Sequence, residues 1–310
     1  MLSPNPKSIA FVGSGALGSY YGAKLARQGA DVRFLMRSDL EAVRRAGLRV
    51  REDGAEWALP VVQAFGSTAE IGPVDLVVIG LKTTANAELE RLIPPLLHEE
   101  TMLLTLQNGL GNEELLAKRW GAERVLGGLC FVCLNRVAPG VIEHYGQGTL
   151  SLGEFQRPIA ERTRAIGTMF STAGIDTFVV ENLVTERWRK LVWNIPFNGL
   201  SIAAGGRTTD VLLADTGMAQ QVRALMAETI AAAKACGHEI PATFIDFQIK
   251  RTSPMGAYKP SSMIDWQHGR AVEVESIWGE PWRQGKAAGA QLPRLEMLYQ
   301  LLRQATMPRK

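Results

Sequence analysis

The feature that most constrains this chain is a set of three glycines placed between an apolar run and a helical pattern. The run Ser8–Val12 ends at Gly13, and Gly15 and Gly18 complete the spacing G-x-G-x-x-G. In a strand–turn–helix unit the first glycine permits the tight turn, the second lets the backbone approach a pyrophosphate, and the third lets helix and strand pack closely. The alternative is an ordinary glycine-rich turn, but the order of strand, turn and helix favours a dinucleotide site.

The N-terminus of the helix that follows offers unpaired N–H groups and the positive end of a dipole to phosphates. The residues expected to contact the dinucleotide are therefore those of the turn itself: Gly13, Ser14, Gly15, Ala16, Leu17 and Gly18.

The second apolar run, Asp31–Met36, indicates which dinucleotide is bound. A site for NAD usually has an acid at the end of this strand, where it accepts hydrogen bonds from the ribose hydroxyls. Here the first residue past the strand is Arg37, and a guanidinium suits a 2′-phosphate. Lys82, just past the run Asp75–Leu81, is a second candidate cation, although a solvated surface lysine is nearly as good an interpretation. We therefore expect NADP(H), while Asp39 leaves open an acid that bends back to the ribose.

Up to about residue 180, short β-rich runs alternate with helical stretches, as in an open, mostly parallel sheet with helices on both faces. Met102–Leu106 and Gly127–Leu134 are further strand-like runs. The segments 141–146 and 149–155 resemble an antiparallel pair. The expected fold class is α/β, with a Rossmann-type doubly wound sheet in an NADP-binding domain, residues 1–180.

After residue 180 the pattern becomes helical, with helices expected over Asp215–Cys236, Ala271–Ala288 and Arg294–Gln304. The second of these is expected to be interrupted near Pro281. An all-helical substrate and catalytic domain, residues 181–310, follows from this pattern.

Composition excludes several classes of protein. The net charge is +3 without any dense run of Lys or Arg, which argues against nucleic acid but suits a small anionic ligand. No apolar run approaches the ~20 residues that span a bilayer, and no secretory signal is recognisable at the start, so a cytoplasmic protein is expected. Cys130 and Cys133 read as part of a strand, and the scattered histidines show no metal-ligand spacing, so no metal is expected.

Three polar residues recur at a spacing of four in the apolar helical stretch WRKLVWNIPFNG: Lys190, Asn194 and Asn198. Each step of four turns a helix by only about 40°, so the three side chains project from one side. Burying a lysine and two carboxamides is costly unless they meet polar partners or a ligand. The alternative is that Lys190 extends to water and the asparagines cap neighbouring loops.

Together these motifs resemble the ketopantoate reductases. The resemblance rests on GSGALG after the first strand, QNG at 107–109, KLVWNIPFN at 190–198, KPSSM at 259–263 and a following GR-x-x-E, in order over nearly the whole chain. It implies a Rossmann domain followed by a helical domain, and the NADPH-dependent reduction of 2-dehydropantoate to pantoate in pantothenate biosynthesis. The partner is then a small anionic 2-oxo acid, and a homodimer is an option that the sequence leaves open.

Carried over position by position, the resemblance makes Lys190 and Glu273 catalytic. Asn108, which would also contact the cofactor, joins Asn194, Asn198 and Ser262 as substrate-binding residues. Arg37 and Lys82 match the cations that bind the NADP phosphate. If the stretch around Glu273 is helical, Glu275 faces about 200° away, so only one of the two glutamates can belong to the site.

The chain departs from the family pattern near the expected substrate. Pro196 lies between the two asparagines, the segment from Met263 to Glu273 is one residue shorter than usual, and EVESIWGEP brings Trp278 to a place expected near the substrate cleft. A related reductase acting on another 2-oxo acid or ketone therefore remains open. A protein that senses NADP(H) without turnover is a weaker alternative, against which the presence of both Lys190 and Glu273 argues.

Overall fold

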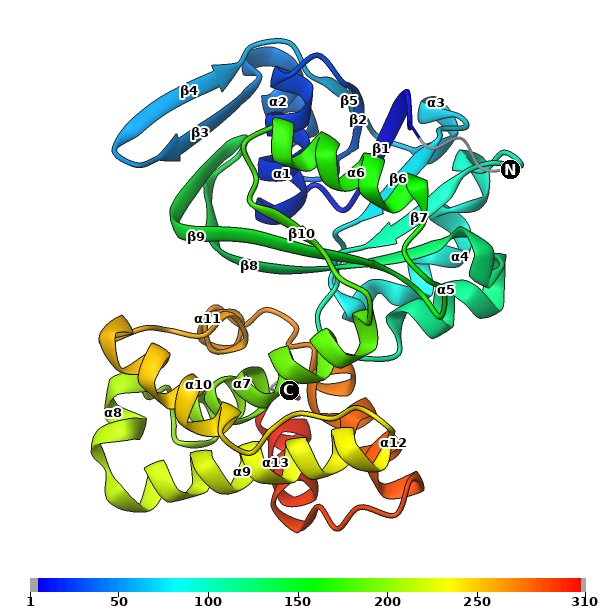
Figure 1. Ribbon diagram of the computed structural model, residues 1–310. Helices are drawn as coiled ribbons and strands as arrows, with labels where there is room; N and C mark the ends of the chain where they lie inside the picture. The colour runs from blue at the N-terminus through cyan, green and yellow to red at the C-terminus, as the bar shows by residue number, and fades with distance from the viewer. Residues whose placement is uncertain (1–4, 308–310) are drawn as a thin grey trace. The chain divides into compact units, whose positions relative to one another are not determined.

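A computed structural model describes residues 5–307. The chain divides into two compact units (Figure 1). The first contains the chain up to Gln107 together with Asn112–Leu183, and the second contains Asn108–Gly111 together with the chain from Val184 onward. The first unit is α/β and the second is helical, which confirms the expected fold class.

The first unit is built on one mixed sheet with the strand order β4-β3-β9-β8-β7-β6-β1-β2-β5, with β10 paired to β9. Its strands are β1 (Ser8–Val12), β2 (Asp31–Leu35), β3 (Leu48–Glu52), β4 (Ala55–Leu59), β5 (Gln63–Phe65), β6 (Leu76–Ile79), β7 (Met102–Thr105), β8 (Val125–Ala138), β9 (Val141–Glu154) and β10 (Thr177–Val179). Its helices are α1 (Ala16–Arg27), α2 (Leu40–Ala46), α3 (Thr68–Ile71), α4 (Leu89–Leu92), α5 (Asn112–Trp120) and α6 (Glu161–Thr172). The run from β5 through β2, β1, β6 and β7 to β8 is parallel throughout.

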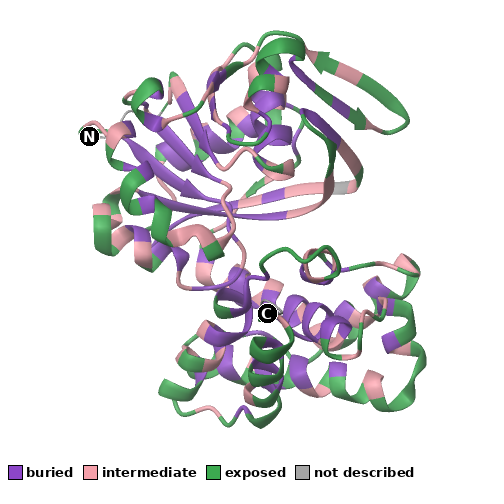
Figure 2. Cartoon of the chain, turned by 180° about the vertical axis from the view of Figure 1, so that it is seen from behind, coloured by how far each residue is buried: buried purple, intermediate pink, exposed green. Residues whose placement is uncertain are grey.

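Both faces of this parallel run are apolar, because successive side chains of a strand point to opposite faces. In β1, Ile9 and Phe11 belong to one hydrophobic cluster and Ala10 and Val12 to another. The first cluster is covered by α1 and α6, and the second by the short helices α3, α4 and α5. Figure 2 shows the strands buried between these helical layers. A continuous apolar strand therefore indicates a doubly wound sheet, as expected.

The expectation of an antiparallel pair within residues 141–155 is wrong. Those residues form one long strand, β9, which pairs antiparallel with β8 over nearly its whole length. Gly146 and Gly148, with φ of 124° and 155°, suggested a turn, but they lie where the register of the hairpin shifts. The glycines serve as irregularities in a bent strand instead of reversing the chain.

The regular secondary structure of the second unit is all helical within its described residues, as predicted. Its helices are α7 (Leu183–Ala203), α8 (Thr209–Ala214), α9 (Thr216–Ala235), α10 (Phe244–Thr252), α11 (Ser261–Gln267), α12 (Glu280–Ala287) and α13 (Pro293–Ala305), with a π-helical turn η5 (Glu275–Gly279) before α12. The helix continues from Val274 through this π-helical turn into α12, so Pro281 does not end it. The regular α-helical hydrogen bonding is replaced by the π-helical turn just before Pro281.

Helix α7 lies in the core of this unit. Its side chains Trp188, Leu191, Val192 and Ile195 are fully or almost fully buried in a cluster that also takes in residues of α9 and α13. The helix continues through Pro196 without a break. A polar residue on α7 is therefore held in a rigid, largely apolar setting.

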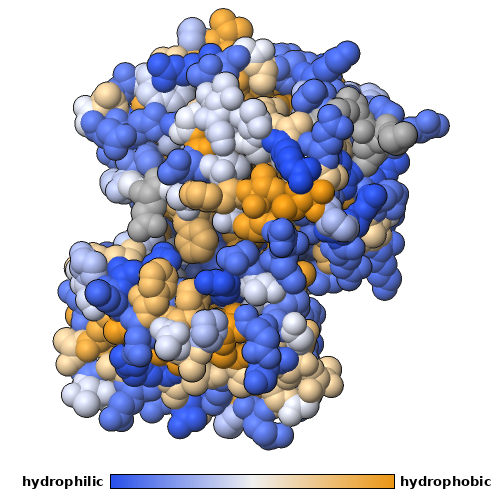
Figure 3. Space-filling model, viewed as in Figure 1, coloured by the Kyte–Doolittle hydropathy of each residue, from blue (hydrophilic) through white to orange (hydrophobic). Residues whose placement is uncertain are grey.

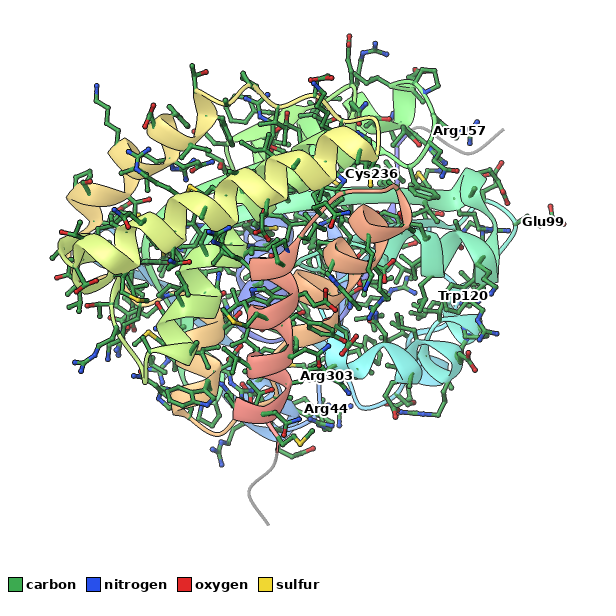
Figure 4. All side chains as sticks on the ribbon, turned by 90° about the horizontal axis from the view of Figure 1, so that it is seen from below. Arg44, Glu99, Trp120, Arg157, Cys236 and Arg303 are labelled. Carbon is green, nitrogen blue, oxygen red and sulfur yellow. The ribbon has the colours of Figure 1, made fainter. Side chains whose placement is uncertain are left out.

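None of the three cysteines, all of which the structure describes, forms a disulfide. Cys130 and Cys133 lie in β8, as expected, and Cys236 follows the end of α9 (Figure 4). Within residues 5–307 no helix is long and apolar enough to cross a membrane. The face shown in Figure 3 is largely hydrophilic, with apolar side chains in separate patches.

Candidate active site

The glycine turn after β1 has the geometry that its spacing predicts. Gly13 has φ of 102°, and a Cβ there would lie 2.3 Å from the backbone nitrogen of Leu81, so only glycine fits. A Cβ on Gly18 would lie 2.4 Å from the carbonyl oxygen of Gly13, which shows how closely α1 packs against the turn. These two glycines are required by the fold itself.

Gly15 differs from its two neighbours in the motif. A Cβ on Gly15 would meet no described heavy atom within 4 Å, and φ of −75° is open to any residue. Gly15 is the N-cap of α1, and the first turn of α1 carries no acidic side chain and no side-chain cap. Free N–H groups and open space at a helix N-terminus fit a pyrophosphate, so the residues present are suited to the dinucleotide.

The two candidate cations follow the two strands that flank β1. Arg37 follows β2 and is exposed, and Lys82 follows β6 at the start of the 3₁₀ turn Thr83–Glu88. Because these strands are parallel, their carboxyl ends share the edge of the sheet at which the glycine turn lies. The structure therefore places both cations at the same edge as Gly13.

The segment after β7 is divided between the units. Gln107 is buried in the first unit, where its side-chain amide donates to the carbonyl oxygen of Leu81 at 2.9 Å and to Oδ1 of Asn86 at 2.7 Å. Asn108 begins the short segment that belongs to the second unit.

Residues 108–111 are seated on the π-helical turn η5. Gly109 has φ of 85°, and a Cβ there would lie 2.1 Å from the carbonyl oxygen of Ser276. The same oxygen accepts the N–H of Leu110 at 3.0 Å. This contact holds Asn108 in place, since a larger residue at 109 would push the segment off η5.

Asn108 in turn holds the candidate catalytic lysine. Nζ of Lys190 on α7 donates to Oδ1 of Asn108 at 2.8 Å, although the two residues are 82 positions apart. Lys190 is only partly exposed. The hydrogen bond fixes where the ammonium lies, while part of the side chain still reaches the surface.

One and two turns further along α7 lie the two asparagines. Oδ1 of Asn198 accepts the backbone N–H of Ser262 at 2.9 Å, and both residues are almost fully buried, at 1% and 3% exposure. Within residues 5–307 the side chains of Asn194 and Ser262 form no hydrogen bond, yet both are more than nine-tenths buried. The polar atoms of these two side chains are not among the fully enclosed unpaired atoms of the described residues, so they remain open to a ligand.

The two neighbouring glutamates have separate environments. Glu273, which is 8% exposed, lies just before η5, the turn that seats residues 108–111. Glu275 is exposed and bonds to Arg283 at 2.9 Å and to the hydroxyl of Tyr299. Burial raises the pKa of Glu275, but these hydrogen bonds outweigh it and lower the pKa. Glu275 is therefore engaged elsewhere, which leaves Glu273 as the candidate of the two.

The expectation for Trp278 is corrected by the structure. Its side chain is fully buried in the core of the helical unit, and its indole N–H donates to the carbonyl oxygen of Ile195 at 2.9 Å. Gly199 makes room for the ring, since a Cβ there would lie 2.8 Å from Nε1. The indole thus supports the bend-prone part of α7 around Pro196 and does not line a ligand site. Sequence reasoning missed this role because it depends on a contact across 83 positions.

The second unit therefore contains an ammonium, carboxamides, a hydroxyl and a buried carboxyl among its candidate residues. An ammonium held by a hydrogen bond can stabilise negative charge that develops on an oxygen, and can give that oxygen a proton. The amides and the hydroxyl can orient a small polar molecule. Such groups suit a reaction in which negative charge develops on a substrate oxygen.

Comparison with known proteins agrees with this chemistry. The family described as ketopantoate reductase PanE/ApbA matches residues 9–157, and its C-terminal domain matches residues 182–306. A 2-dehydropantoate 2-reductase from Nostoc sp. is 42% identical over 304 residues, which cover 96% of this chain and 95% of that protein.

Solved structures give the same result. The crystal structure of 2-dehydropantoate 2-reductase from Geobacter metallireducens GS-15 has a TM-score of 0.94 and 46% identity, covering 96% of this chain and 100% of that one. The enzyme of the same name from Methylococcus capsulatus has a TM-score of 0.88 and 33% identity, with 96% of each chain covered. This chain therefore belongs to the ketopantoate reductase family of oxidoreductases.

Proposed function

We propose that this chain reduces 2-dehydropantoate to pantoate with NADPH. The observation that carries the proposal is the polar set centred on α7, in which Asn108 holds the ammonium of Lys190, Asn194 lies one turn further along the helix, and Asn198 accepts the backbone N–H of Ser262 on α11. The relatives that are named 2-dehydropantoate 2-reductases, at 42% and 46% identity, support the choice of substrate.

The proposed roles follow from the chemistry of each side chain. Bound NADPH supplies the hydride that reaches the carbonyl carbon of the 2-oxo acid. Lys190 stabilises the negative charge that develops on the carbonyl oxygen and delivers the proton that completes the alcohol. Asn108 keeps the ammonium in place through its 2.8 Å hydrogen bond, so no reorganisation is needed during the reaction.

The remaining residues bind the substrate. Dehydropantoate has a carboxylate, the 2-oxo group and a terminal hydroxyl, and each needs a partner in a buried site. We assign Asn194 and Asn198 to its oxygens through their amide N–H groups, Ser262 to the carboxylate through its hydroxyl, and Glu273 to the terminal hydroxyl as an acceptor. In Asn198 the carbonyl oxygen already accepts from the backbone of Ser262, which turns its NH₂ group away from α11.

In the first unit, the glycine turn and the N-terminus of α1 bind the pyrophosphate in this proposal. Arg37 and Lys82 bind the 2′-phosphate that distinguishes NADPH from NADH. The open space beside Gly15 and the exposed guanidinium of Arg37 support this assignment.

The test is a panel of oxo acids assayed by the loss of NADPH absorbance. We expect dehydropantoate to give the highest kcat/KM, ahead of 2-oxo acids that lack the terminal hydroxyl. A higher kcat/KM for another oxo acid would show that this acid is the better substrate, while the proposed type of reaction would stand. Tight NADPH binding without turnover of any carbonyl compound would show that the chain is a sensor and contradict the proposal.

A further inference from the structure

The loop between β2 and α2 carries the one acid that could serve an NAD site, two residues after Arg37. Asp39 is only 6% exposed, whereas Arg37 and Ser38 are exposed. The acid and the guanidinium thus face different surroundings, although they are neighbours in sequence.

Both carboxylate oxygens of Asp39 are already occupied. Oδ1 accepts from Nη1 of Arg136 at 2.7 Å and from the hydroxyl of Ser38 at 2.8 Å, and Oδ2 accepts the backbone N–H of Gly140 at 3.1 Å. To accept from ribose hydroxyls, as the acid of an NAD site does, Asp39 would have to leave a buried N–H and a guanidinium without their acceptor.

The partners of Asp39 come from a distant hairpin that is itself fixed. Arg136 lies near the end of β8, 97 positions from Asp39, and Gly140 is in the turn between β8 and β9. Gly140 has φ of 71°, and a Cβ there would lie 3.1 Å from the carbonyl oxygen of Gly47. Its own carbonyl oxygen accepts the N–H of Arg49 at 2.8 Å. These contacts hold the turn against the end of α2 and the start of β3.

We propose that Arg136 is a positioning residue that sets the preference for NADPH over NADH. The ion pair with Arg136 keeps the carboxylate of Asp39 from accepting hydrogen bonds from the ribose. The guanidinium also offsets the negative charge of Asp39. Arg37 and Arg136 then set two cations against the one anion, Asp39, which suits a 2′-phosphate and disfavours an unmodified ribose. This inference rests on the proposed NADPH dependence and deepens it. Arg136 acts through Asp39 and need not touch the cofactor.

The experiment measures the Kd of NADPH and of NADH by quenching of the intrinsic fluorescence of the full chain. The variants are Arg136→Met, Arg136→Lys and, as a matched control, Arg51→Met, which removes an equally charged residue from the exposed pair that Arg51 forms with Glu56. We expect Arg136→Met to lower the ratio of NADH Kd to NADPH Kd by about tenfold, a change within the range for removing one charge contact. Arg136→Lys keeps most of the ratio, and Arg51→Met matches the wild type.

A double variant tests the route of the effect. If Arg136 acts through Asp39, then Arg136→Met combined with Asp39→Asn restores much of the ratio, because the released carboxylate is gone. A ratio that stays low in the double variant, or one that is unchanged in Arg136→Met, overturns the inference while the proposed function stands. Equal Kd values for NADPH and NADH in the wild type would instead contradict the NADPH preference itself, and the inference with it.

Discussion

Substitution of Ser262 distinguishes a binding role from a structural one more clearly than substitution of any other residue of the candidate site. Its backbone N–H bonds to Asn198, but within residues 5–307 its hydroxyl has no partner. Ser262→Ala therefore removes no hydrogen bond from the folded chain. We expect KM for dehydropantoate to rise about tenfold, the scale of one lost polar contact to a charged group, with Tm unchanged. The check is steady-state kinetics beside a thermal melt, and a lower Tm with unchanged KM would contradict the assignment.

How far single residues could be predicted depends on whether their role is local. Lys190, Asn194 and Asn198 share a helix, so their spacing alone placed them on one side. The bond from Lys190 to Asn108 and the pairing of Asp39 with Arg136 join residues 82 and 97 positions apart. Nothing in the sequence near either residue specifies such a partner, and only the fold reveals it.

The glycine turn and α1 offer a matched pair of variants. Gly13→Ala puts a methyl group 2.3 Å from the backbone of Leu81 and forces a positive φ on alanine, so we expect a loss of about 2–4 kcal/mol in the free energy of unfolding. Gly15→Ala meets nothing in the folded chain, so we expect Tm to stay the same while the Kd of NADPH rises at least about tenfold. Urea unfolding and cofactor titration measure the two effects. If Gly15→Ala binds NADPH as well as the wild type, the turn does not hold the pyrophosphate.

Helix α7 and the turn η5 depend on each other through Trp278. Trp278→Phe keeps an aromatic ring in the core but removes the N–H that reaches Ile195, next to Pro196. We expect the chain to lose about 1–3 kcal/mol of unfolding free energy and the kcat for dehydropantoate to fall, because Asn194 and Asn198 flank the affected carbonyl. The Kd of NADPH, measured alongside, serves as the control and should not change. A variant that is less stable but has full kcat would show that Trp278 supports the core and not the site.

For helices and strands, the sequence pattern was reliable where the apolar residues kept one regular spacing along the whole element. It located α9 and α13 to within a few residues of their observed bounds. It failed at β9, where Gly146 and Gly148 looked like a turn. Within residues 271–288 it found the helix, which begins at Val274, but not the π-helical turn. In both places the backbone departs from a regular repeat. Such departures are set by the neighbouring strand or helix, so the local sequence pattern does not reveal them.

We expect the free energy of unfolding to fall at acid pH, because carboxylates of the first unit lose their hydrogen bonds and ion pairs when they are protonated. Glu52 accepts from Tyr20 at 2.7 Å and from Trp57 at 2.8 Å, and it lies 3.3 Å from the ammonium of Lys24. Burial raises the pKa of Glu52, but these partners outweigh it and lower the pKa. Hydrogen bonds, above all from the backbone of Ser8, likewise lower the pKa of Asp75 against the effect of burial.

The direction of the pH effect follows from these shifts. The unfolded chain takes up protons on such carboxyls near their ordinary pKa of about 4, whereas the folded chain takes them up only at lower pH. Stability from these groups is therefore complete above about pH 5 and is lost as the pH falls through about 4 and below. We expect Tm to fall between pH 6 and pH 3, and to fall less steeply in Glu52→Gln, which starts from a lower value. Parallel curves for the two proteins would show that Glu52 does not contribute.

The chemistry of the whole account depends on the ammonium of Lys190. The most direct test compares the kcat of Lys190→Ala with that of Lys234→Ala, which removes an exposed lysine of α9 that pairs only loosely with Glu239, at 3.9 Å. With dehydropantoate and saturating NADPH, we expect kcat of Lys190→Ala to fall by about 10²–10⁴, as for loss of a general acid, while the Kd of NADPH stays the same and Lys234→Ala keeps full activity. A kcat in Lys190→Ala equal to that of the wild type would contradict the account.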